Sequence, residues 1–392
     1  MSLTSHDGST RPGLSEVEGL TMSLKLLKSS MKQVVQKSIE GVRLDEREGT
    51  LLYELDLPRL GMIADARRRT LLERESFKKH NTEIVTFVVD RQINYTNVCI
   101  TDCGFCAFYR HPGDHDTYTL DVETILKKVE ALVKAGGTQV LLQGGHNPEL
   151  HIEYYENVFR AIKKTFPQIY LHSLTASELD HIAKMSKLEV KEVIRRLQDA
   201  GWGSLPGGGA EILVERVKNI LSPKKISVDR WFEIHEICHT SGIRSTATMM
   251  FGTVETKAER IQHLQRVRDV QDRTKGFRAF IPWSFCGGET ELEGLGEPGG
   301  VDYLKTLAIS RIFLDNIPYI HTGWVTEGMK VAQAGLYFGA DDFGSILYEE
   351  KVITSTGVDH QPSINEIVHA IQQTGKIAAQ RDTEYHILKI FD

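Results

Sequence analysis

The chain lacks the features of a membrane protein or a secreted protein. No apolar run approaches the roughly 18–20 residues that a membrane-spanning helix needs. Residues 1–20 are polar and contain no apolar stretch typical of a signal peptide. Only five cysteines occur, an odd number with three of them clustered, so a disulfide framework is not expected. We therefore expect a cytoplasmic protein in a reducing compartment, with no membrane partner.

Basic charge and nucleotide-binding motifs are also missing. The formal net charge is −6, whereas a protein that binds nucleic acid is usually basic, so no nucleic-acid partner is expected. There is no P-loop, and no G-x-G-x-x-G opens a helix after a strand. The run Gly207-Gly208-Gly209 is not a nucleotide fingerprint by itself. The net charge does not exclude a small anionic substrate, because local basic residues can bind an anion whatever the total charge of the chain.

What is present is a regular alternation of strand-like and helix-like segments. The expected strands are 83–89, 138–143, 169–174, 202–206, 243–250, 277–285, 317–325 and 335–339. The expected helices are 122–132 (capped by Asp121), 153–165, 177–200, 210–220, 228–240, 256–272, 301–316 and 327–335. About eight strand–helix units in 392 residues predict an α/β fold, a (β/α)8 TIM-type barrel with an N-terminal helical extension and a C-terminal helical tail.

The chain divides into four expected regions. Residues 1–22, rich in Ser, Gly and Thr, are expected to be flexible. Residues 23–80 form the helical extension, and residues 81–345 form the barrel. Residues 346–392 form a C-terminal segment that packs on the barrel. No motif indicates the oligomeric state, although a homodimer is common for soluble barrels.

Polar and glycine-rich patches follow most of the expected strands. They are Gln143–His146, His172-Ser173, Gly209–Glu211, Thr248–Glu255, Trp283–Gly288 and His321–Trp324. Because the carboxyl ends of barrel strands meet at one mouth, these patches can face one another. This convergence predicts an enzyme.

Three cysteines after the first strand carry the strongest chemical signal. Cys99, Cys103 and Cys106 have the spacing C-x3-C-x2-C. Thiolates suit iron–sulfur clusters and zinc. Three thiolates on a [4Fe–4S] cluster leave one iron open to a small molecule. A closed zinc site with His111 as fourth ligand, or three free thiols, remains an alternative.

With Phe105 before the last cysteine, the motif resembles that of the radical S-adenosylmethionine (SAM) superfamily. The resemblance implies a [4Fe–4S] cluster and SAM as cofactors, with an electron donor such as flavodoxin or ferredoxin. The cluster would cleave SAM to methionine and a 5′-deoxyadenosyl radical. Phe105 and Ala107 would place backbone near the adenine. Gly144 and Gly145 would let backbone approach the methionine amino group, although a double glycine by itself is more often a turn.

Further candidates for the SAM site are Ser173, Glu211 and Arg216. Glu211 could bind the ribose hydroxyls or the ammonium group, or it could be a first-turn carboxylate that meets a helix dipole. Arg216 could pair with the SAM carboxylate, or it could be an exposed helix arginine.

Three histidines at expected strand ends are candidate proton acceptors. They are His146, His172 and His321. A lone histidine is more often a hydrogen-bonding partner than a catalyst, but three at one mouth favour a catalytic role for one of them. Weaker candidates for contacts to a substrate carboxylate or hydroxyl are Arg244, Arg278 and Asp315. Cys238 is expected in the core and Cys286 is expected to be incidental.

The resemblance extends beyond the cysteines, from about residue 94 to residue 381. Asn94–Arg110, Ser222–Ser227, Ala247–Gly252, Phe280–Trp283 and Ala378–Thr383 resemble the dehypoxanthine futalosine cyclase family of the futalosine route to menaquinone. That family implies a nucleoside-derived substrate with a benzoate group. The radical would take hydrogen from C4′ of the ribose, and the sugar radical would close a ring on the benzoate. Loss of an electron and a proton restores aromaticity.

One loop departs from the family pattern. A Gln-Pro-Gly-like run is expected after Phe285, and this chain has Cys286-Gly287-Gly288. Aminofutalosine synthase and the deazaflavin synthases therefore remain as alternative enzymes. Two other classes also remain: a non-catalytic electron carrier or metal sensor, which would want a fourth protein ligand, and a structural barrel with vestigial cysteines.

Overall fold

A computed structural model describes residues 29–73, 81–349, 351–357, 360 and 362–391. The expected flexible segment 1–22 lies outside the described residues. In the described part of the chain, no helix combines the length and the apolar character needed to cross a membrane.

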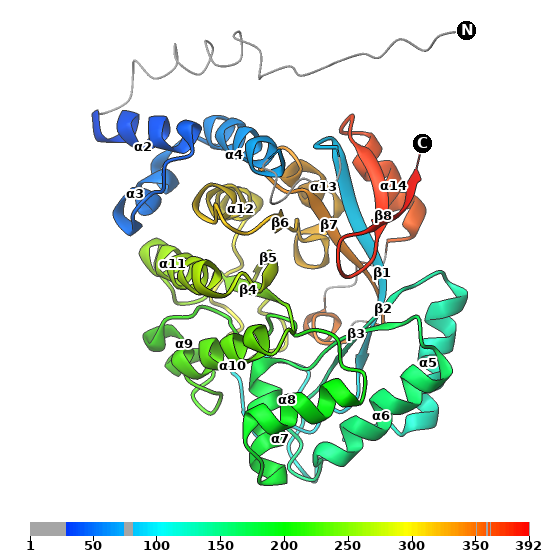
Figure 1. Ribbon diagram of the computed structural model, residues 1–392. Coiled ribbons are helices and arrows are strands. Elements are labelled where there is room, and N and C mark those ends of the chain that lie inside the picture. The colour runs from blue at the N-terminus through cyan, green and yellow to red at the C-terminus, as the bar shows by residue number, and fades with distance from the viewer. Residues whose placement is uncertain (1–28, 74–80, 350, 358–359, 361, 392) are drawn as a thin grey trace, which may run out of the picture.

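Parallel strands surround the centre of the molecule (Figure 1). They are β1 (Ile84–Asn94), β2 (Gln139–Gln143), β3 (Tyr170–Ser173), β4 (Ser245–Phe251), β5 (Phe277–Ser284), β6 (Tyr319–Ile320) and β7 (Asp342–Tyr348). Ladders join β1 to β2, β2 to β3, β4 to β5 and β5 to β6, and β7 pairs back with β1. Single bridges at Ser204, Leu205 and His321 complete the ring between β3 and β4 and between β6 and β7. The ring of a TIM-type barrel is therefore confirmed, and Ser204 and Leu205 join it through isolated bridges instead of a regular strand.

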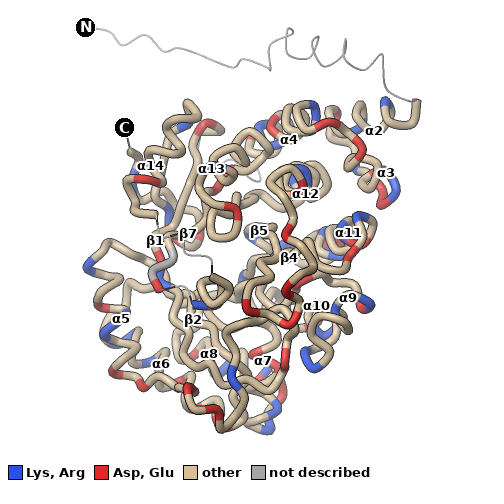
Figure 2. The backbone as a smooth tube through the Cα atoms, turned by 180° about the vertical axis from the view of Figure 1, so that it is seen from behind, with Lys and Arg blue, Asp and Glu red and all other residues tan. Residues whose placement is uncertain are grey.

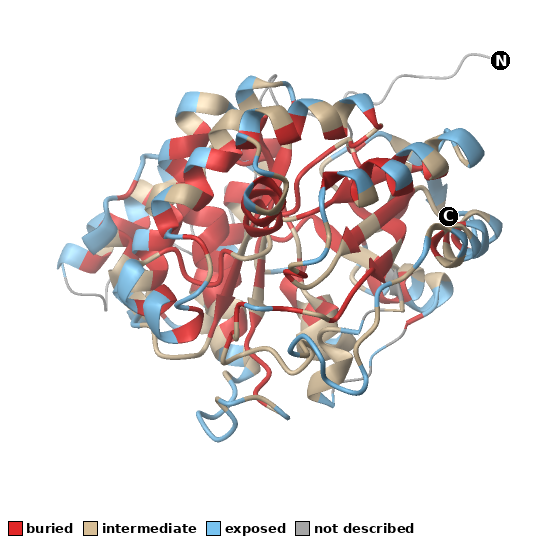
Figure 3. Ribbon diagram, turned by 90° about the horizontal axis from the view of Figure 1, so that it is seen from below, coloured by how far each residue is buried: buried red, intermediate tan, exposed pale blue. Residues whose placement is uncertain are grey.

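Helices on the outside of the barrel connect its strands. They are α5 (Val122–Lys134), α6 (Ile152–Thr165), α7 (Ala176–Ser186), α8 (Val190–Asp199), α9 (Glu215–Leu221), α10 (Val228–Thr240), α11 (Lys257–Thr274), α12 (Gly300–Phe313) and α13 (Trp324–Gly335). Asp121 caps α5 as expected, accepting a hydrogen bond from the Thr124 N–H. Figure 3 shows the buried residues gathered on the strands and on the inner helix faces. Figure 2 shows Lys and Arg lying among Asp and Glu along the outer helices.

Two expected elements differ from the structure. The long helix 177–200 is two helices, because Lys187 adopts the left-handed conformation with φ 54° and ends α7. The last strand is not 335–339 but β7, which begins at Asp342. Asp341 and Asp342, where this strand begins, look like a polar turn in the sequence. In the structure both are buried, and Asp341 pairs with Arg311 while Asp342 pairs with Arg381. These ion pairs allow acidic residues inside the barrel wall.

Two further expected segments are shorter than predicted. The strand 317–325 is reduced to Tyr319–Ile320, because the chain turns into α13 at Trp324. The helix 210–220 begins only at Glu215. The preceding residues form a loop in which Glu211 has φ 43°.

The N-terminal extension is helical, as expected. It consists of α2 (Ser29–Glu40), α3 (Glu46–Leu51), the short turn η2 (Leu52–Glu54) and α4 (Leu57–Leu72). The helix α4 packs on α12, and α3 packs on α11 (Figure 1). The extension therefore covers one side of the barrel away from the cysteine loop.

The C-terminal segment contains strands as well as a helix. It consists of the turn η3 (Thr354–Thr356), α14 (Ile364–Gln372), β8 (Ile377–Arg381) and β9 (Ile387–Phe391). The strand β8 pairs with Ile84–Val88 at the start of β1, and β9 pairs antiparallel to β8. Because β8 joins the beginning of a barrel strand, the turn after it lies at the end of the barrel opposite the strand-end loops. That turn supplies part of the floor of the cavity described below.

Candidate functional site

Two adjoining cavities of about 270 Å³ each lie inside the barrel. The first, called the central cavity, is lined by Val88, Asp90, Gln139, Leu141, Gln143, His172, Pro206–Gly209, Glu211, Thr246, Thr248, Arg278, Ile281, Trp283, His321, Ser345, Arg381, Thr383 and Tyr385. The second, called the side cavity, reaches toward Trp324 and Ile353. They share Leu141, Gln143, Ile281, Trp283, His321 and Ser345. Each by itself approaches the lower end of the size range of a small-molecule site, and the two together fall within that range.

The central cavity changes character along the strands. On β5 its lining passes from Arg278 at the start through Ile281 to Trp283 near the end. On β2 it passes from Gln139 through Leu141 to Gln143. The cavity therefore has a polar floor at the strand beginnings, an apolar middle, and a mouth near Gly207–Gly209. Such a shape can hold a molecule with polar ends and an apolar centre.

The cysteine loop follows β1 at the mouth of the barrel, as expected. Backbone hydrogen bonds hold its two limbs together, from Cys99 N to Arg110 O at 2.9 Å and from Arg110 N to Asn97 O at 2.8 Å. Cys99 and Cys103 are buried, and Cys106 is partly buried. In the described part of the chain, no three Cys, His, Asp or Glu side chains meet the geometry of a single-ion site.

Two groups contact the sulfur atoms. The Thr101 hydroxyl lies 3.0 Å from the Cys99 sulfur and 3.5 Å from the Cys103 sulfur. The backbone N–H of His146 donates a hydrogen bond to the Cys99 sulfur at 3.3 Å. Donors to sulfur are a means of tuning an iron–sulfur cluster. Sequence reasoning missed Thr101, although its place between two cysteines was a usable signal.

The glycine pair lies directly against the cysteine loop. A Cβ atom on Gly145 would lie 2.2 Å from the Val98 carbonyl oxygen and 2.9 Å from the Cys99 Cβ. A Cβ atom on Gly144 would lie 2.8 Å from the Tyr95 ring. Two parts of the backbone thus approach each other more closely than any side chain allows. This contact with the cysteine loop is a second reason for glycine here, and the predicted approach of the pair to the methionine amino group of SAM stays a prediction.

Glu211 connects the cysteine loop to the central cavity. Its carboxylate lies 3.0 Å from the Lys218 ammonium and 3.2 Å from that of Lys225. Burial by itself would raise the pKa of Glu211, but the two lysines lower that pKa to about 2. Lys225 also lies 5.1 Å from the centre of the Phe105 ring. Sequence reasoning did not single out Lys225, although it lies within the Ser222–Ser227 motif.

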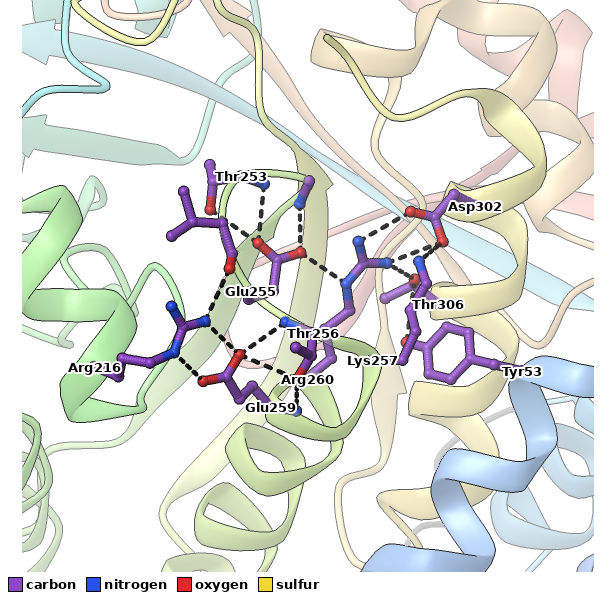
Figure 4. A network of polar contacts seen from close by, with 12 residues as sticks. Tyr53, Arg216, Thr253, Glu255, Thr256, Lys257, Glu259, Arg260, Asp302 and Thr306 are labelled. Carbon is purple, nitrogen blue, oxygen red and sulfur yellow. Dashed lines mark hydrogen bonds and ion pairs between the residues drawn. The ribbon is translucent and has the colours of Figure 1, made fainter. Parts of the chain in front are cut away.

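Arg216 does not reach the cavity. Its guanidinium makes two hydrogen bonds of 2.7 Å to Glu259, and it donates a third, of 2.8 Å, to the Val254 carbonyl (Figure 4). Its side chain is half exposed. The structure therefore supports the alternative reading of Arg216 as a helix arginine in an ion pair.

The three candidate histidines have different surroundings. His172 and His321 line the central cavity, whereas His146 stacks on His181 with ring centres 4.9 Å apart. His172 Nδ1 lies 2.7 Å from the Ser204 hydroxyl, and its Nε2 has no hydrogen-bond partner among the described residues. His321 Nε2 lies 2.6 Å from the Tyr385 hydroxyl. Burial lowers the pKa of His172 well below its usual value and that of His321 to about 4.

The remaining predicted residues are not brought to the cavity. The Ser173 side chain is buried behind His172, and the Ala107 carbonyl accepts a hydrogen bond from Arg110. Asp315 pairs with Arg43 on the surface. His111 is exposed beside Asp102.

The loop that departs from the family pattern also lies outside the cavities. Cys286, Gly287 and Gly288 are not among the described residues that line either of them. Arg244 is likewise outside, and it pairs with Glu384. The departure therefore does not change the lining of the described cavities.

The residues at the mouth fit an iron–sulfur cluster with SAM. Three thiols lie on one loop, a backbone donor points at one sulfur, and two glycines keep the adjoining space free of side chains. A buried carboxylate, Glu211, lies between the loop and the cavity and can receive a cationic group. Cys99, Cys103 and Cys106 would hold the cluster, which leaves one iron for SAM.

Two family models match nearly the whole barrel and tail. The radical SAM superfamily model matches residues 93–267, and the CofH/MqnC C-terminal region model matches residues 274–392. The second match includes the turn that forms the cavity floor. The cysteine loop lies in the first match, whereas Arg278, Arg381 and the C-terminal turn of the floor lie in the second.

Curated relatives extend over the same range. The chain is 45% identical to a cyclic dehypoxanthine futalosine synthase of Streptomyces coelicolor, covering 93% of this chain and 90% of the relative. It is 43% identical to a synthase of the same name from Halalkalibacterium halodurans, covering 93% and 96%. It is 35% identical to an aminodeoxyfutalosine synthase of Thermus thermophilus, covering 92% and 96%.

Solved structures support the fold. A crystal structure of methylornithine synthase matches with a TM-score of 0.67 at 18% identity, covering 88% of this chain and 96% of that one. At this identity the likeness concerns the architecture of the barrel.

Proposed function

Because the chain belongs to the radical SAM superfamily and to its CofH/MqnC branch, we propose that it is a radical SAM cyclase that converts dehypoxanthine futalosine to its cyclic form in menaquinone biosynthesis. The observation that carries this proposal is the identity of 43–45% to two synthases of that name over 93% of the chain. The relative named as an aminodeoxyfutalosine synthase is more distant, at 35%.

The proposal assigns the cofactors to the mouth of the barrel. Cys99, Cys103 and Cys106 would hold a [4Fe–4S] cluster, and Gly145 with Glu211 would border SAM. When bound, the reduced cluster and SAM supply a 5′-deoxyadenosyl radical that abstracts hydrogen from C4′ of the substrate ribose. The buried cavity would exclude water from the substrate during the reaction.

The chain's own residues would position the substrate and take up a proton. Ring closure forms a bond from C4′ to the benzoate ring, and the ring then loses one proton to a base and one electron, which would pass to the oxidised cluster. The apolar middle of the central cavity, at Leu141 and Ile281, suits the benzoate ring. His172 lies beside this region, because its backbone is in register with Leu141.

We propose that His172 is the proton acceptor. Burial lowers its pKa well below the usual value, so the imidazole stays neutral, and able to accept a proton, from pH 8 down through pH 6. His172→Gln should lower product formation about 100-fold and leave 5′-deoxyadenosine formation within about threefold of the unmodified enzyme. The rate of product formation by the unmodified enzyme should not fall as the pH is lowered from 8 to 6. An H172Q variant with full product yield would reject this role.

The function itself is tested by a turnover assay. The chain is reconstituted anaerobically with iron and sulfide, incubated with dithionite, SAM and dehypoxanthine futalosine, and analysed by mass spectrometry. We expect a product two hydrogens lighter than the substrate, with one 5′-deoxyadenosine formed per turnover. Deoxyadenosine without that product would reject this substrate and retain the radical chemistry. Tightly bound zinc with no deoxyadenosine would reject both.

We also propose that the chain works in the cytoplasm and receives its electron from a flavodoxin or a ferredoxin. The three clustered cysteines, which form no disulfide among the described residues, support the location. Replacement of dithionite by a reduced flavodoxin in the assay tests the donor, and cell fractionation tests the location. A homodimer stays a prediction, which sedimentation analysis would test.

A further inference from the structure

The floor of the central cavity carries a cluster of charged residues that the radical chemistry does not require. The cluster consists of Asp90, Arg278, Asp342, Arg381 and Glu384. Asp90, Arg278 and Arg381 line the cavity. Asp342 and Glu384 lie behind the two arginines and pair with them. The C-terminal turn, which contributes Thr383 and Tyr385 to the lining, joins this floor to the rest of the barrel.

Arg278 is a cationic member of the cluster with an unused hydrogen-bond donor. Its side chain is only 2% exposed. One terminal nitrogen, Nη1, pairs with Glu384, whereas Nη2 is buried and has no hydrogen-bond partner among the described residues. A buried guanidinium with an unused donor carries a large desolvation cost. Nη2 is shielded in the side-chain position described, so a small shift of the guanidinium would bring it to an anionic ligand in the cavity, and that contact would remove the cost.

The charges around Arg278 are not balanced. Arg381 and Asp342 form a pair of their own, with two hydrogen bonds between them. Glu384, in contrast, is shared by Arg278 and Arg244. Two arginines that share one carboxylate leave a surplus of one positive charge beside the cavity.

Asp90 does not cancel this surplus. Its Oδ1 is buried with no hydrogen-bond partner among the described residues, and Oδ2 accepts a hydrogen bond from Gln139 at 3.1 Å. Burial raises the pKa of Asp90 well above the usual range, which favours the neutral acid. A neutral carboxyl group can donate a hydrogen bond to an anion instead of repelling it.

We propose that Arg278 binds a carboxylate of the substrate through its free Nη2, and so sets the depth at which the substrate lies in the barrel. This inference rests on the proposed function, in which the substrate carries a benzoate group. A carboxylate on the floor places the aromatic ring in the apolar middle and the ribose toward the mouth. Glu384 is a positioning residue, because it holds Nη1 and so orients the guanidinium.

The test compares two substrates that differ in charge and are nearly equal in size. They are dehypoxanthine futalosine and its methyl ester, in which the benzoate is neutral. The unmodified enzyme should prefer the acid by about 100-fold in kcat/KM, because a desolvated charge pair is lost in the ester. Arg278→Gln should lower kcat/KM for the acid by about 100-fold and leave that for the ester within about threefold. The preference should therefore fall close to one.

Arg244→Gln is the matched control. Arg244 pairs with the same Glu384 at 3.3 Å, but its side chain is 41% exposed, and it is not among the described lining residues. R244Q should keep the full preference for the acid. If R278Q retained the preference, or if it lowered the rates of acid and ester equally, the proposed contact would be wrong.

Two further measurements keep the proposal testable if R278Q fails to fold. Arg278→Lys keeps the charge and should retain at least a tenfold preference for the acid. Binding of 3-acetylbenzoate and its methyl ester to the unmodified, reconstituted enzyme needs no turnover. Equal binding of the two probes would overturn the carboxylate site. A wild-type enzyme that binds the acid selectively but does not convert dehypoxanthine futalosine would reject the proposed function and retain the carboxylate site.

Discussion

Replacing Cys103 by alanine should abolish both 5′-deoxyadenosine and cyclic product, with a loss of at least about 1,000-fold, because a cluster held by three thiolates loses one of its ligands. Cys103 is buried, and its sulfur lies 3.5 Å from the Thr101 hydroxyl, which also contacts Cys99. No other cysteine among the described residues lies on this loop apart from Cys99 and Cys106. Iron and sulfide content after anaerobic reconstitution, together with the two product yields, measures the effect.

Cys238→Ala is the control for this experiment. Cys238 is fully buried on α10, where alanine removes one sulfur atom from the core. That variant should lose about 1 kcal/mol of unfolding free energy and keep its iron and its activity. If C103A kept a full complement of iron and produced deoxyadenosine, the assignment of the cluster to this loop would be wrong.

Gly145→Ala should lower product formation about 100-fold, because a displacement of about 1 Å at a reacting centre has an effect of that size. The new Cβ would lie 2.2 Å from the Val98 carbonyl oxygen, which is a backbone atom and cannot turn away as a side chain can. Either the cysteine loop or the strand end after β2 must move. The Cys99 sulfur and its hydrogen bond from His146 would move with it.

The measurement for Gly145→Ala is the yield of product and of deoxyadenosine, together with the visible spectrum of the cluster with and without SAM. Gly299→Ala is the matched control, because a Cβ there meets no described atom within 4 Å and its φ of −78° suits alanine. G299A should keep its activity within about twofold. Full activity of G145A would show that this close approach does not constrain the cysteine loop.

Much of the architecture follows from local patterns in the chain. The strand–helix alternation predicted the barrel, and Asp121 was correctly expected to cap α5. Local patterns failed where a residue's partner is distant in sequence. Asp341 and Asp342 resemble a polar turn until Arg311 and Arg381 neutralise them inside the wall. The break at Lys187 was missed because the apolar pattern continues on both sides of it.

The candidate site likewise combines features set by local sequence with features set by contacts between distant residues. The cysteine motif and the glycine pair are short-range features, because each is set by the spacing of adjacent residues along one loop. Sequence reasoning named Arg216 for the SAM carboxylate and Arg278 as a weaker candidate for a contact to the substrate. In the structure Arg216 is satisfied by Glu259, whereas Arg278 lies on the cavity with an unused donor.

By itself, the sequence determined the family, the three thiols and the order of the barrel elements, because these depend on residue type and near-neighbour spacing. Only the tertiary structure decided which side chains enclose the cavity. Its floor combines Asp90 and Arg278 from the wall with Arg381 at the end of β8 and Tyr385 from the turn that follows it. Whether a buried charge is paired or free depends on contacts between residues far apart in the sequence, as between Arg278 and Glu384, which only the closed barrel brings together.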